Sequence, residues 1–309
     1  MPKLSVVVPV YYNQDSLQAL YEELREKVFA RGDFDYELIL VDDGSKDASW
    51  EIIQELARQD AKVKAVHLSR NFGSHAAILC GLSKASGDCA VVKAADLQEP
   101  TELVLSLYDK WREGYNVVLA VREGRPEKAS QQLFANTYYA MVRRLALPGM
   151  PKAGFDVYLL DKKVIRVLEL LDEKNSALTG QILWSGFKTA QVPYIRVERK
   201  AGKSRWTLRK KVRLVLDTLF SFTSLPISVV LTVGVLSSVV SVLWGTVLIV
   251  LRLAGVVNEI GWTSLFVFQL FSFGVTMLTL GILGEYLWRT FDAARNRPVY
   301  IVEDEINFE

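Results

Sequence analysis

The chain has 309 residues, enough for one large domain with an appendage or for two modest domains. Half of the residues are hydrophobic, and the mean hydropathy of +0.17 is high for a soluble protein in which 23% of the residues are charged. The formal net charge is only +2, which excludes the strongly basic balance of a nucleic-acid-binding protein.

Up to about residue 160, apolar runs alternate with helical patterns, which predicts an α/β domain with a mostly parallel sheet. The apolar runs are of the kind found in sheets covered on both faces. We predict strands at 4–10, 36–42, 63–68, 89–94 and 116–121, and helices at 16–31, 48–58, 74–85 and 101–113. The next segments are a loop at 122–126, an amphipathic helix at 130–144 and a strand-like run at 154–161 followed by a short helix.

Two apolar stretches near the C-terminus, 227–251 and 263–288, each have the roughly 20 residues needed to cross a bilayer. Basic residues cluster before the first stretch and after the second, so the positive-inside rule places both ends in the cytoplasm. Residues 207–222 have the spacing of an amphipathic helix suited to the lipid interface. The strand-like tail at 297–302 pairs either with a neighbouring copy or with its own chain.

The catalytic part is predicted to be cytosolic. The chain enters its first strand at Lys3 without a signal-peptide pattern. Cys80 and Cys89 are the only cysteines, and both lie in apolar segments. We therefore expect buried, reduced thiols rather than a disulfide.

The most informative run is 37–47, in which four apolar residues lead to Asp42, Asp43, a glycine and a serine. Ligands of open α/β sheets bind at the carboxyl ends of the strands. Two adjacent carboxylates there can accept hydrogen bonds from a base or a ribose, or help to hold a divalent cation. The run therefore predicts a ligand site at this edge of the sheet.

Together with Ser5–Val10 before it and the run Ala95-Asp96-Leu97-Gln98 after it, this segment resembles the family 2 glycosyltransferases, which have a GT-A fold. The resemblance implies a cytosolic GT-A (Rossmann-like) catalytic domain at 1–206 and an amphipathic juxtamembrane helix at 207–224. It further implies two transmembrane helices within 225–288 and a cytosolic tail at 289–309.

The resemblance also implies which residues bind the nucleotide sugar. The loop after the first strand corresponds to the family's base-contacting loop, although Gln14 stands where an acid is usual. The loop at 69–74 opens a helix, whose amides and arginine suit a phosphate, and His67 is predicted to be a packed core residue. The predicted binding residues are Pro9, Tyr11, Asn13, Asp42, Asp43, Arg70, Asp96 and Gln98.

The predicted metal site departs from the family pattern. Many relatives end the fourth strand with Asp-x-Asp, whereas Ala94 replaces the first acid here and Asp96 remains. Mg²⁺ needs only one or two protein carboxylates beside substrate phosphates. Asp96 is therefore expected to hold Mg²⁺ or Mn²⁺ with support from Gln98 or Asp43, while Glu99 is expected to serve the following helix start.

The run from Ala95 to Pro100 resembles one branch of the family, the membrane-anchored polyprenyl-phosphate glycosyltransferases. Residues 196–206 resemble that branch's Arg-x-x-Gly-x-Ser-(Lys/Arg)-(Trp/Tyr) segment, which suits a lipid phosphate. The lipid-phosphate residues are then Arg199, Lys203, Ser204 and Arg205. Asp156 is the catalytic candidate beside Asp96, to orient the donor sugar or a metal-bound water or to assist as a base.

The sequence thus predicts an inverting transferase in the cytoplasmic membrane. It would move one hexose, such as glucose, from a UDP-sugar to polyprenyl (undecaprenyl) phosphate and release UDP, without a nucleic-acid partner and as a homo-oligomer. One alternative is a polysaccharide- or glycolipid-forming transferase, although the expected Arg before Trp184 is missing. The other is a non-catalytic nucleotide-sugar-binding membrane subunit. No motif identifies the sugar.

Overall fold

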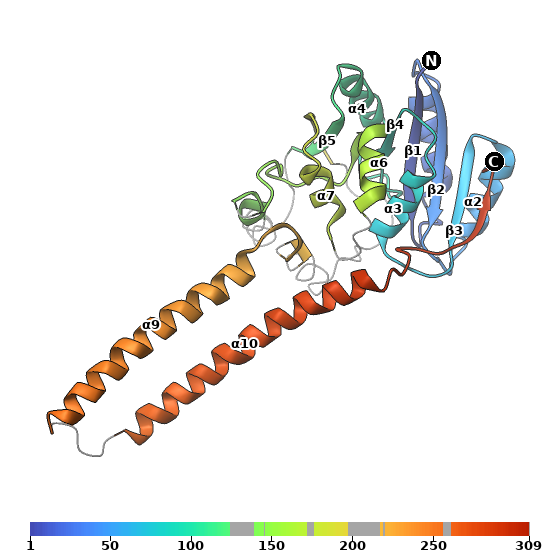
Figure 1. The fold of residues 1–309 in the computed structure, drawn as a ribbon. Helices are drawn as coiled ribbons and strands as arrows, with labels where there is room; N and C mark the ends of the chain where they lie inside the picture. Colours follow the sequence, from blue (N-terminus) through green and yellow to red (C-terminus); the bar gives the residue numbers. More distant parts are fainter. Residues whose placement is uncertain are drawn as a thin grey trace. The chain divides into compact units, whose positions relative to one another are not determined.

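The structure is a computed structural model that describes residues 1–123, 139–144, 146–171, 176–196, 217–218, 220–255 and 261–308. It divides into two compact units (Figure 1). Unit 1 comprises residues 1–215 together with 298–309, and unit 2 comprises residues 216–297. The chain therefore leaves unit 1, forms unit 2 and returns to unit 1 for its last residues.

Unit 1 is built on one sheet in the order β7-β5-β6-β4-β1-β2-β3-β8. Within the described residues only β6 and β8 run antiparallel to their neighbours, so the predicted mixed α/β fold with a mostly parallel sheet is confirmed. The strands are β1 (Lys3–Val10), β2 (Asp35–Asp42), β3 (Val63–Leu68), β4 (Cys89–Val92), β5 (Val117–Arg122), β6 (Tyr158–Asp161), β7 (Thr189–Tyr194) and β8 (Val302–Ile306).

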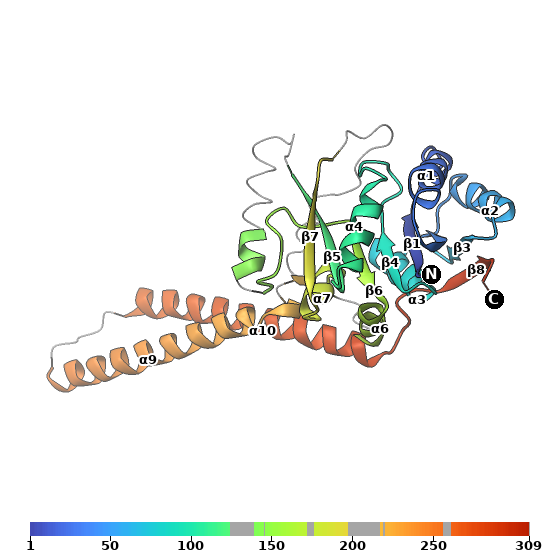
Figure 2. The ribbon, with the colours of Figure 1, turned by 90° about the horizontal axis from the view of Figure 1, so that it is seen from above.

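Helices cover both faces of this sheet (Figure 2). Both faces are covered because both carry apolar side chains, as the alternate residues of β1 illustrate. Val6 and Val8 belong to the core beneath α1, α2 and α4. Val7 points to the other face, where α3 lies close enough that a Cβ on Gly81 would be 2.3 Å from its side chain. The helices are α1 (Leu17–Leu24), the π-helical η1 (Arg25–Phe29), α2 (Ser49–Gln59), α3 (Ser74–Ser83), α4 (Leu103–Arg112), α6 (Lys162–Leu171) and α7 (Leu178–Trp184).

Both cysteines of unit 1 are free and fully buried, as expected. Burial raises the pKa of the Cys80 thiol to about 12, so it remains protonated at neutral pH. Cys80 lies in α3 and Cys89 begins β4. Their role is packing.

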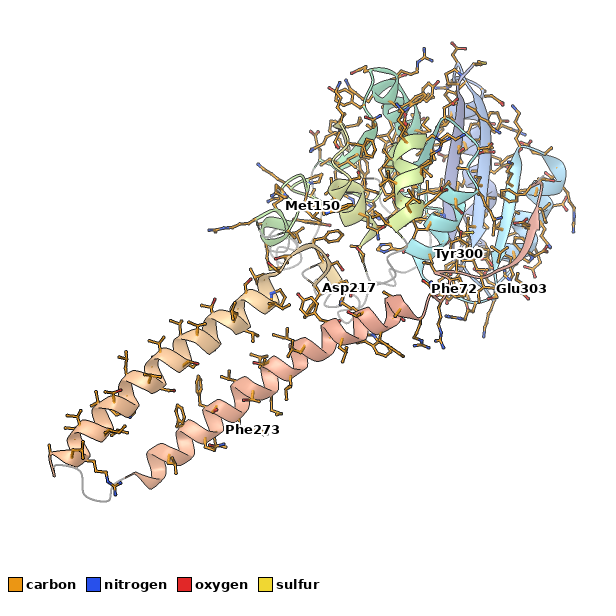
Figure 3. All side chains as sticks on the ribbon, viewed as in Figure 1. Phe72, Met150, Asp217, Phe273, Tyr300 and Glu303 are labelled. Atoms are coloured by element: carbon orange, nitrogen blue, oxygen red, sulfur yellow. The ribbon has the colours of Figure 1, made fainter. Side chains whose placement is uncertain are left out.

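Unit 2 consists mainly of two long antiparallel helices, α9 (Leu225–Leu253) and α10 (Trp262–Ala294). Both are long and apolar enough to cross a membrane, and their described apolar side chains point outward (Figure 3). α10 continues past the predicted end at residue 288. Beyond that point Arg289 is paired with Glu285 at 2.9 Å and with Asp217 at 2.8 Å.

Two predicted helices fall partly outside the described residues. Of the helix predicted at 130–144, residues 139–144 are described and are helical. Of the amphipathic helix predicted at 207–222, the described residues are 217–218 and 220–222, and they are helical.

The C-terminal tail packs against its own chain, which is one of the two alternatives left open by the sequence, but the strand that pairs is β8 at 302–306 rather than the predicted 297–302. β8 pairs antiparallel with β3 at the edge of the sheet. Asn307 Nδ2 donates hydrogen bonds to the carbonyls of Ala57 at 2.7 Å and Val63 at 2.8 Å. The tail is therefore an integral part of unit 1.

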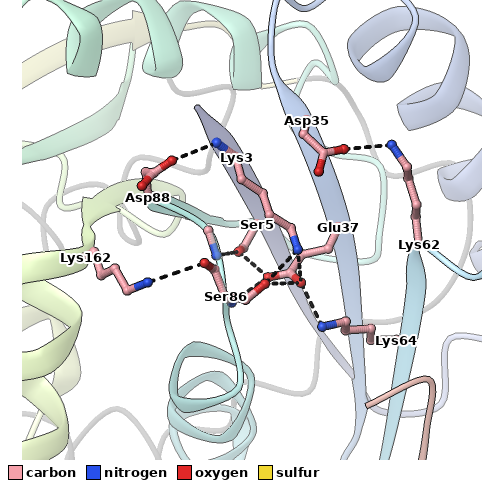
Figure 4. Close-up of polar contacts among 10 residues, drawn as sticks. Lys3, Ser5, Asp35, Glu37, Lys62, Lys64, Ser86, Asp88 and Lys162 are labelled. Carbon is pink, nitrogen blue, oxygen red and sulfur yellow. Dashed lines mark hydrogen bonds and ion pairs between the residues drawn. The ribbon is translucent and has the colours of Figure 1, made fainter. Parts of the chain in front are cut away.

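A buried carboxylate lies near the amino-terminal ends of the parallel strands (Figure 4). Glu37 is 1% exposed. Its oxygens accept hydrogen bonds from Ser5 Oγ at 2.6 Å and from the backbone N of Ser86 at 2.6 Å. Its Oε2 also lies 2.9 Å from Lys64 Nζ and 3.2 Å from Lys3 Nζ. This network joins β1, β2 and β3 to the turn before β4.

Candidate active site

The carboxyl ends of the parallel strands share one edge of the sheet, where open α/β proteins bind ligands. β6 runs antiparallel to β4 and β5, so its beginning lies at this same edge. The acids predicted from the sequence fall here in two groups. One group follows β1 and β2, and the other follows β4, β5 and the loop before β6.

Asp42 ends β2 and is completely buried. Its Oδ2 accepts a hydrogen bond from the backbone N of Ser45 at 3.1 Å and lies 2.7 Å from His67 Nδ1. Its Oδ1 is buried and has no hydrogen-bond partner among the described residues. A buried acceptor without a donor is unfavourable, so Asp42 is suited to accept a hydrogen bond from a ligand N–H or O–H.

Asp43 holds the loop that follows β3. Its Oδ1 accepts a hydrogen bond from the backbone N of Phe72 at 2.7 Å. Its Oδ2 accepts from the backbone N of Gly73 at 2.9 Å and from Asn71 Nδ2 at 2.8 Å. Burial raises the pKa of Asp43, and the two backbone amides partly counter that rise. The carboxylate shapes the loop, and its direct contact with a nucleotide stays a prediction.

The turn after Asp43 packs directly on the same loop. Gly44 has a φ of +65°, and a Cβ there would lie 2.5 Å from the backbone carbonyl carbon of Arg70. Only glycine fits this approach without strain. The Arg70 side chain is exposed, with its guanidinium carbon 4.0 Å from the centroid of the Phe72 ring. Arg70 therefore lies at the loop surface, and its contact with a phosphate stays a prediction.

The loop after β1 lies against the turn after β2. Pro9 pairs with Val41 in the sheet, and the backbone N of Tyr12 donates to Ser45 Oγ at 3.0 Å. Asn13 Oδ1 accepts a hydrogen bond from the backbone N of Tyr11 at 3.0 Å. The structure therefore brings Pro9, Tyr11 and Asn13 beside the Asp42 turn, and their contact with the base stays a prediction.

The loop after β4 carries Asp96 and Gln98 above a buried ion pair. Asp96 Oδ1 accepts a hydrogen bond from the backbone N of Gln98 at 3.3 Å. Lys93 is 1% exposed, and its Nζ donates to the Glu99 carbonyl at 2.9 Å and lies 3.9 Å from Glu99 Oε2. Burial lowers the pKa of Lys93 and raises that of Glu99, while their mutual attraction opposes both shifts. Glu99 thus faces Lys93, which corrects the prediction that it serves the start of the following helix.

The acceptor-side candidate Asp156 is held by an arginine from β5. Arg122 ends β5, donates from Nε to the Tyr194 hydroxyl at 3.1 Å and forms an ion pair with the Asp156 carboxylate. Arg122 and Tyr194 are also paired in the ladder between β5 and β7. The Asp156 side chain is 58% exposed. This arrangement orients the carboxylate and leaves it accessible to a substrate.

Arg196 connects β7 to the loop after β4. Its guanidinium donates to Gln98 Oε1, and burial lowers its pKa. Its Nε is buried without a hydrogen-bond partner among the described residues. The predicted lipid-phosphate residues that follow it in sequence, Arg199, Lys203, Ser204 and Arg205, lie outside the described residues.

No group of three or more His, Cys, Asp or Glu side chains suited to a metal ion occurs in the described part of the chain. Asp96 is the carboxylate that family resemblance assigns to the ion, and Gln98 already accepts from Arg196. Such a donor set fits an ion that takes its remaining ligands from substrate phosphates and water.

Sequence reasoning missed three contributors to this edge. His67 was predicted to be a core residue, yet its ring contacts Asp42. Lys93 lies within the strand predicted at 89–94. A lysine inside an apolar strand, next to Ala94 and shortly before Asp96, was a usable signal that it belongs to the site. Arg122 was read as a loop residue, and no pattern in the sequence shows that it reaches Asp156.

Comparison with known proteins identifies the family of the chain. The profile described as Glycosyl transferase family 2 matches residues 5–153. The chain is 38% identical to "Uncharacterized glycosyltransferase YkcC" of Bacillus subtilis (strain 168), over 99% of this chain and 94% of that protein. It is 33% identical to "Bactoprenol glucosyl transferase" of Shigella phage SfV, over 98% of this chain and 99% of that protein.

Among solved structures, mannosyl-3-phosphoglycerate synthase from Rubrobacter xylanophilus aligns with a TM-score of 0.49 and 16% identity, over 84% of this chain and 77% of that one. The sequence relatives, which extend over nearly the whole length, establish the family. The chain belongs to glycosyltransferase family 2 and is a glycosyltransferase.

Proposed function

We propose that the protein transfers glucose, with inversion, from UDP-glucose to a polyprenyl phosphate at the cytoplasmic face of a membrane and releases UDP. The observation that carries this proposal is the similarity, over 97% or more of the chain, to several proteins named bactoprenol glucosyl transferase. The two long apolar helices support a lipid acceptor. The geometry at the sheet edge supports a nucleotide-sugar donor.

The donor would bind across the ends of β1, β2 and β3. The free Oδ1 of Asp42 suits the imide N–H of a uracil, because that oxygen lacks a donor in the described part of the chain. Tyr11 and Asn13 would flank the base. Arg70 would contact the diphosphate from the loop that Asp43 holds in place.

The diphosphate would extend toward the loop after β4. Asp96 would hold a divalent cation, Mg²⁺ or Mn²⁺, whose chemistry is to neutralise the charge of the departing UDP. Gln98 would contact the donor sugar or diphosphate while Arg196 fixes its orientation. Lys93 stiffens this loop from below because it is anchored to the Glu99 carbonyl.

The acceptor supplies its own nucleophile. A phosphate monoester has a second pKa near 6, so its oxygen is largely ionised at neutral pH. That oxygen would attack the anomeric carbon while the bond to UDP breaks and its electron pair leaves with UDP. Asp156, oriented by Arg122, would position the donor sugar or assist as a base, and catalysis would come mainly from positioning.

The same proposal includes the membrane assignment. Arg199, Lys203, Ser204 and Arg205 would bind the lipid phosphate beside an amphipathic helix at 207–224. The basic flanks favour cytosolic termini in a bacterial inner membrane, and two spans per chain favour a homo-oligomer. The predicted division into 1–206, 207–224, 225–288 and 289–309 stays a prediction, although the structure groups 298–309 with unit 1.

The test is transfer from a panel of radiolabelled UDP-sugars to undecaprenyl phosphate by the full chain in detergent, with Mg²⁺, Mn²⁺ or EDTA. We expect one labelled, chloroform-soluble product from UDP-glucose that disappears with EDTA. Asp96→Asn serves as the inactive control. UDP binding without a lipid product from any donor would instead indicate the non-catalytic subunit, and a labelled polymer would indicate a polysaccharide synthase.

A further inference from the structure

The C-terminal tail contacts an element of the candidate donor site. β8 follows α10 in the chain and pairs with β3, the strand that leads into the loop Ser69–Gly73 (Figure 3). The backbone N of Ser69 donates a hydrogen bond to the carbonyl of Ile301 at 3.0 Å. The first residue of the loop is therefore fixed by the tail, while Asp43 fixes its other end.

The pairing of β8 with β3 is irregular beside this loop. His67 is paired with Asp304 and Leu68 with Val302, so Glu303 is an extra residue in the ladder. A bulge of this kind re-aims the side chain of the extra residue. Glu303 Oε2 lies 3.7 Å from His67 Nε2, which is an electrostatic contact rather than a hydrogen bond.

The His67 ring is held on its other sides as well. Its Nδ1 lies 2.7 Å from Asp42 Oδ2, and because a carboxylate only accepts, Nδ1 carries the proton and donates. The Trp50 indole stacks on the ring with centroids 4.8 Å apart and an interplanar angle of 28°. Asp42 and Trp50 therefore orient the His67 ring, and Glu303 faces its Nε2.

We propose that His67 and Glu303 are positioning residues for the nucleotide donor. Glu303 orients His67, His67 holds Oδ2 of Asp42, and Asp42 thereby presents its unpartnered Oδ1 to the base. This inference rests on the proposed function, in which Asp42 accepts a hydrogen bond from the uracil. It makes the segment after the membrane hairpin a working part of donor binding, although it lies about 150 residues beyond the matched family profile.

The experiment measures UDP affinity by calorimetry on the full chain in detergent, together with donor KM, kcat and thermal unfolding. His67→Phe keeps the stack on Trp50 but removes the donor to Asp42. His67→Asn restores an N–H near the position of Nδ1. Glu303→Gln removes the charge facing His67, and Glu305→Gln is its matched control, because Glu305 lies on the same strand and pairs with Lys84 instead.

We expect His67→Phe to raise the Kd for UDP and the donor KM about tenfold, with kcat changed less than threefold. His67→Asn should recover most of the affinity. Glu303→Gln should weaken UDP binding by about two- to fivefold, and Glu305→Gln should leave it unchanged.

Three results would overturn the relay, by which we mean the positioning of Asp42 by Glu303 through His67. Equal losses in His67→Phe and His67→Asn that follow the melting temperature would show a purely structural role. Equal effects of Glu303→Gln and Glu305→Gln would remove Glu303 from the relay. Wild-type affinity in His67→Phe would reject the relay and leave the proposed function intact, whereas a wild-type protein that binds no UDP would reject the proposed donor itself.

Discussion

Replacement of Glu37 by Gln should destabilise unit 1 without affecting its chemistry. Burial alone would raise the pKa of Glu37, but hydrogen bonds from Ser5, Lys64 and Ser86 lower it from 4.5 to about 2. At 1.36 kcal/mol per pKa unit, the difference between the unfolded and folded pKa values corresponds to roughly 3 kcal/mol of unfolding free energy at neutral pH. The amide group of Gln would also place a donor against the ammonium groups of Lys64 and Lys3.

The assay is thermal unfolding of the full chain in detergent, followed by intrinsic fluorescence. Because one kcal/mol shifts the melting temperature of a domain of this size by roughly 2–4 °C, we expect Glu37→Gln to lower it by about 6–12 °C at pH 7. Asp35→Asn is the matched control, since Asp35 and Lys62 form an exposed ion pair in the same close-up (Figure 4). Such a pair contributes at most about 1 kcal/mol.

The pH dependence has a definite sign. The folded-state pKa of Glu37 lies below its unfolded value, so its stabilising contribution is complete above about pH 4.5 and is lost as the pH falls toward 2. The gap between wild type and Glu37→Gln should therefore narrow across that window. A shift below about 2 °C at pH 7, or a gap that widens on acidification, would refute the reasoning.

Three further substitutions probe the other unit-1 contacts and unit 2. Gly44→Ala should raise the Kd for UDP at least tenfold or cost about 1–3 kcal/mol of stability, because its Cβ would meet the Arg70 backbone; unchanged affinity and melting temperature would contradict this. Lys93→Met should lower the free energy of unfolding by about 3–5 kcal/mol, because it leaves the Glu99 carboxylate unpaired. Adding Glu99→Met should restore most of this loss in thermal unfolding. No recovery would indicate that the Lys93 anchor itself carries the stability. Arg289→Met should speed hydrogen exchange at the helical residues 217–218 and 220–222 about tenfold, because Asp217 loses its cation; Arg289→Lys is the control, and unchanged exchange would show that this ion pair does not hold those residues.

Much of the fold was predictable because apolar patterning and strand ends are local properties. The strand at 63–68 agrees with β3 at both ends, and the two long helices were evident from apolar length alone. The acids at strand ends were also predictable, because parallel strands place their carboxyl ends at one edge. Asp42 and Asp96 lie at that edge for this reason.

What the sequence could not show are pairings between distant segments. The contact of His67 with Asp42 depends on the register between β2 and β3. The ion pair of Arg122 with Asp156 depends on β6 being antiparallel, which a short apolar run does not encode. The return of residues 298–309 to the β3 edge spans some 230 residues, a separation at which no periodicity is informative.

The position of β8 in the chain has a consequence for biosynthesis. β3 presents an open row of backbone donors and acceptors until β8 covers it, and exposed edges of this kind promote aggregation. The ribosome makes β8 only after both apolar helices. The sheet can therefore be completed only after both helices have been synthesised, so chains that stop early keep an open β3 edge that is prone to aggregation.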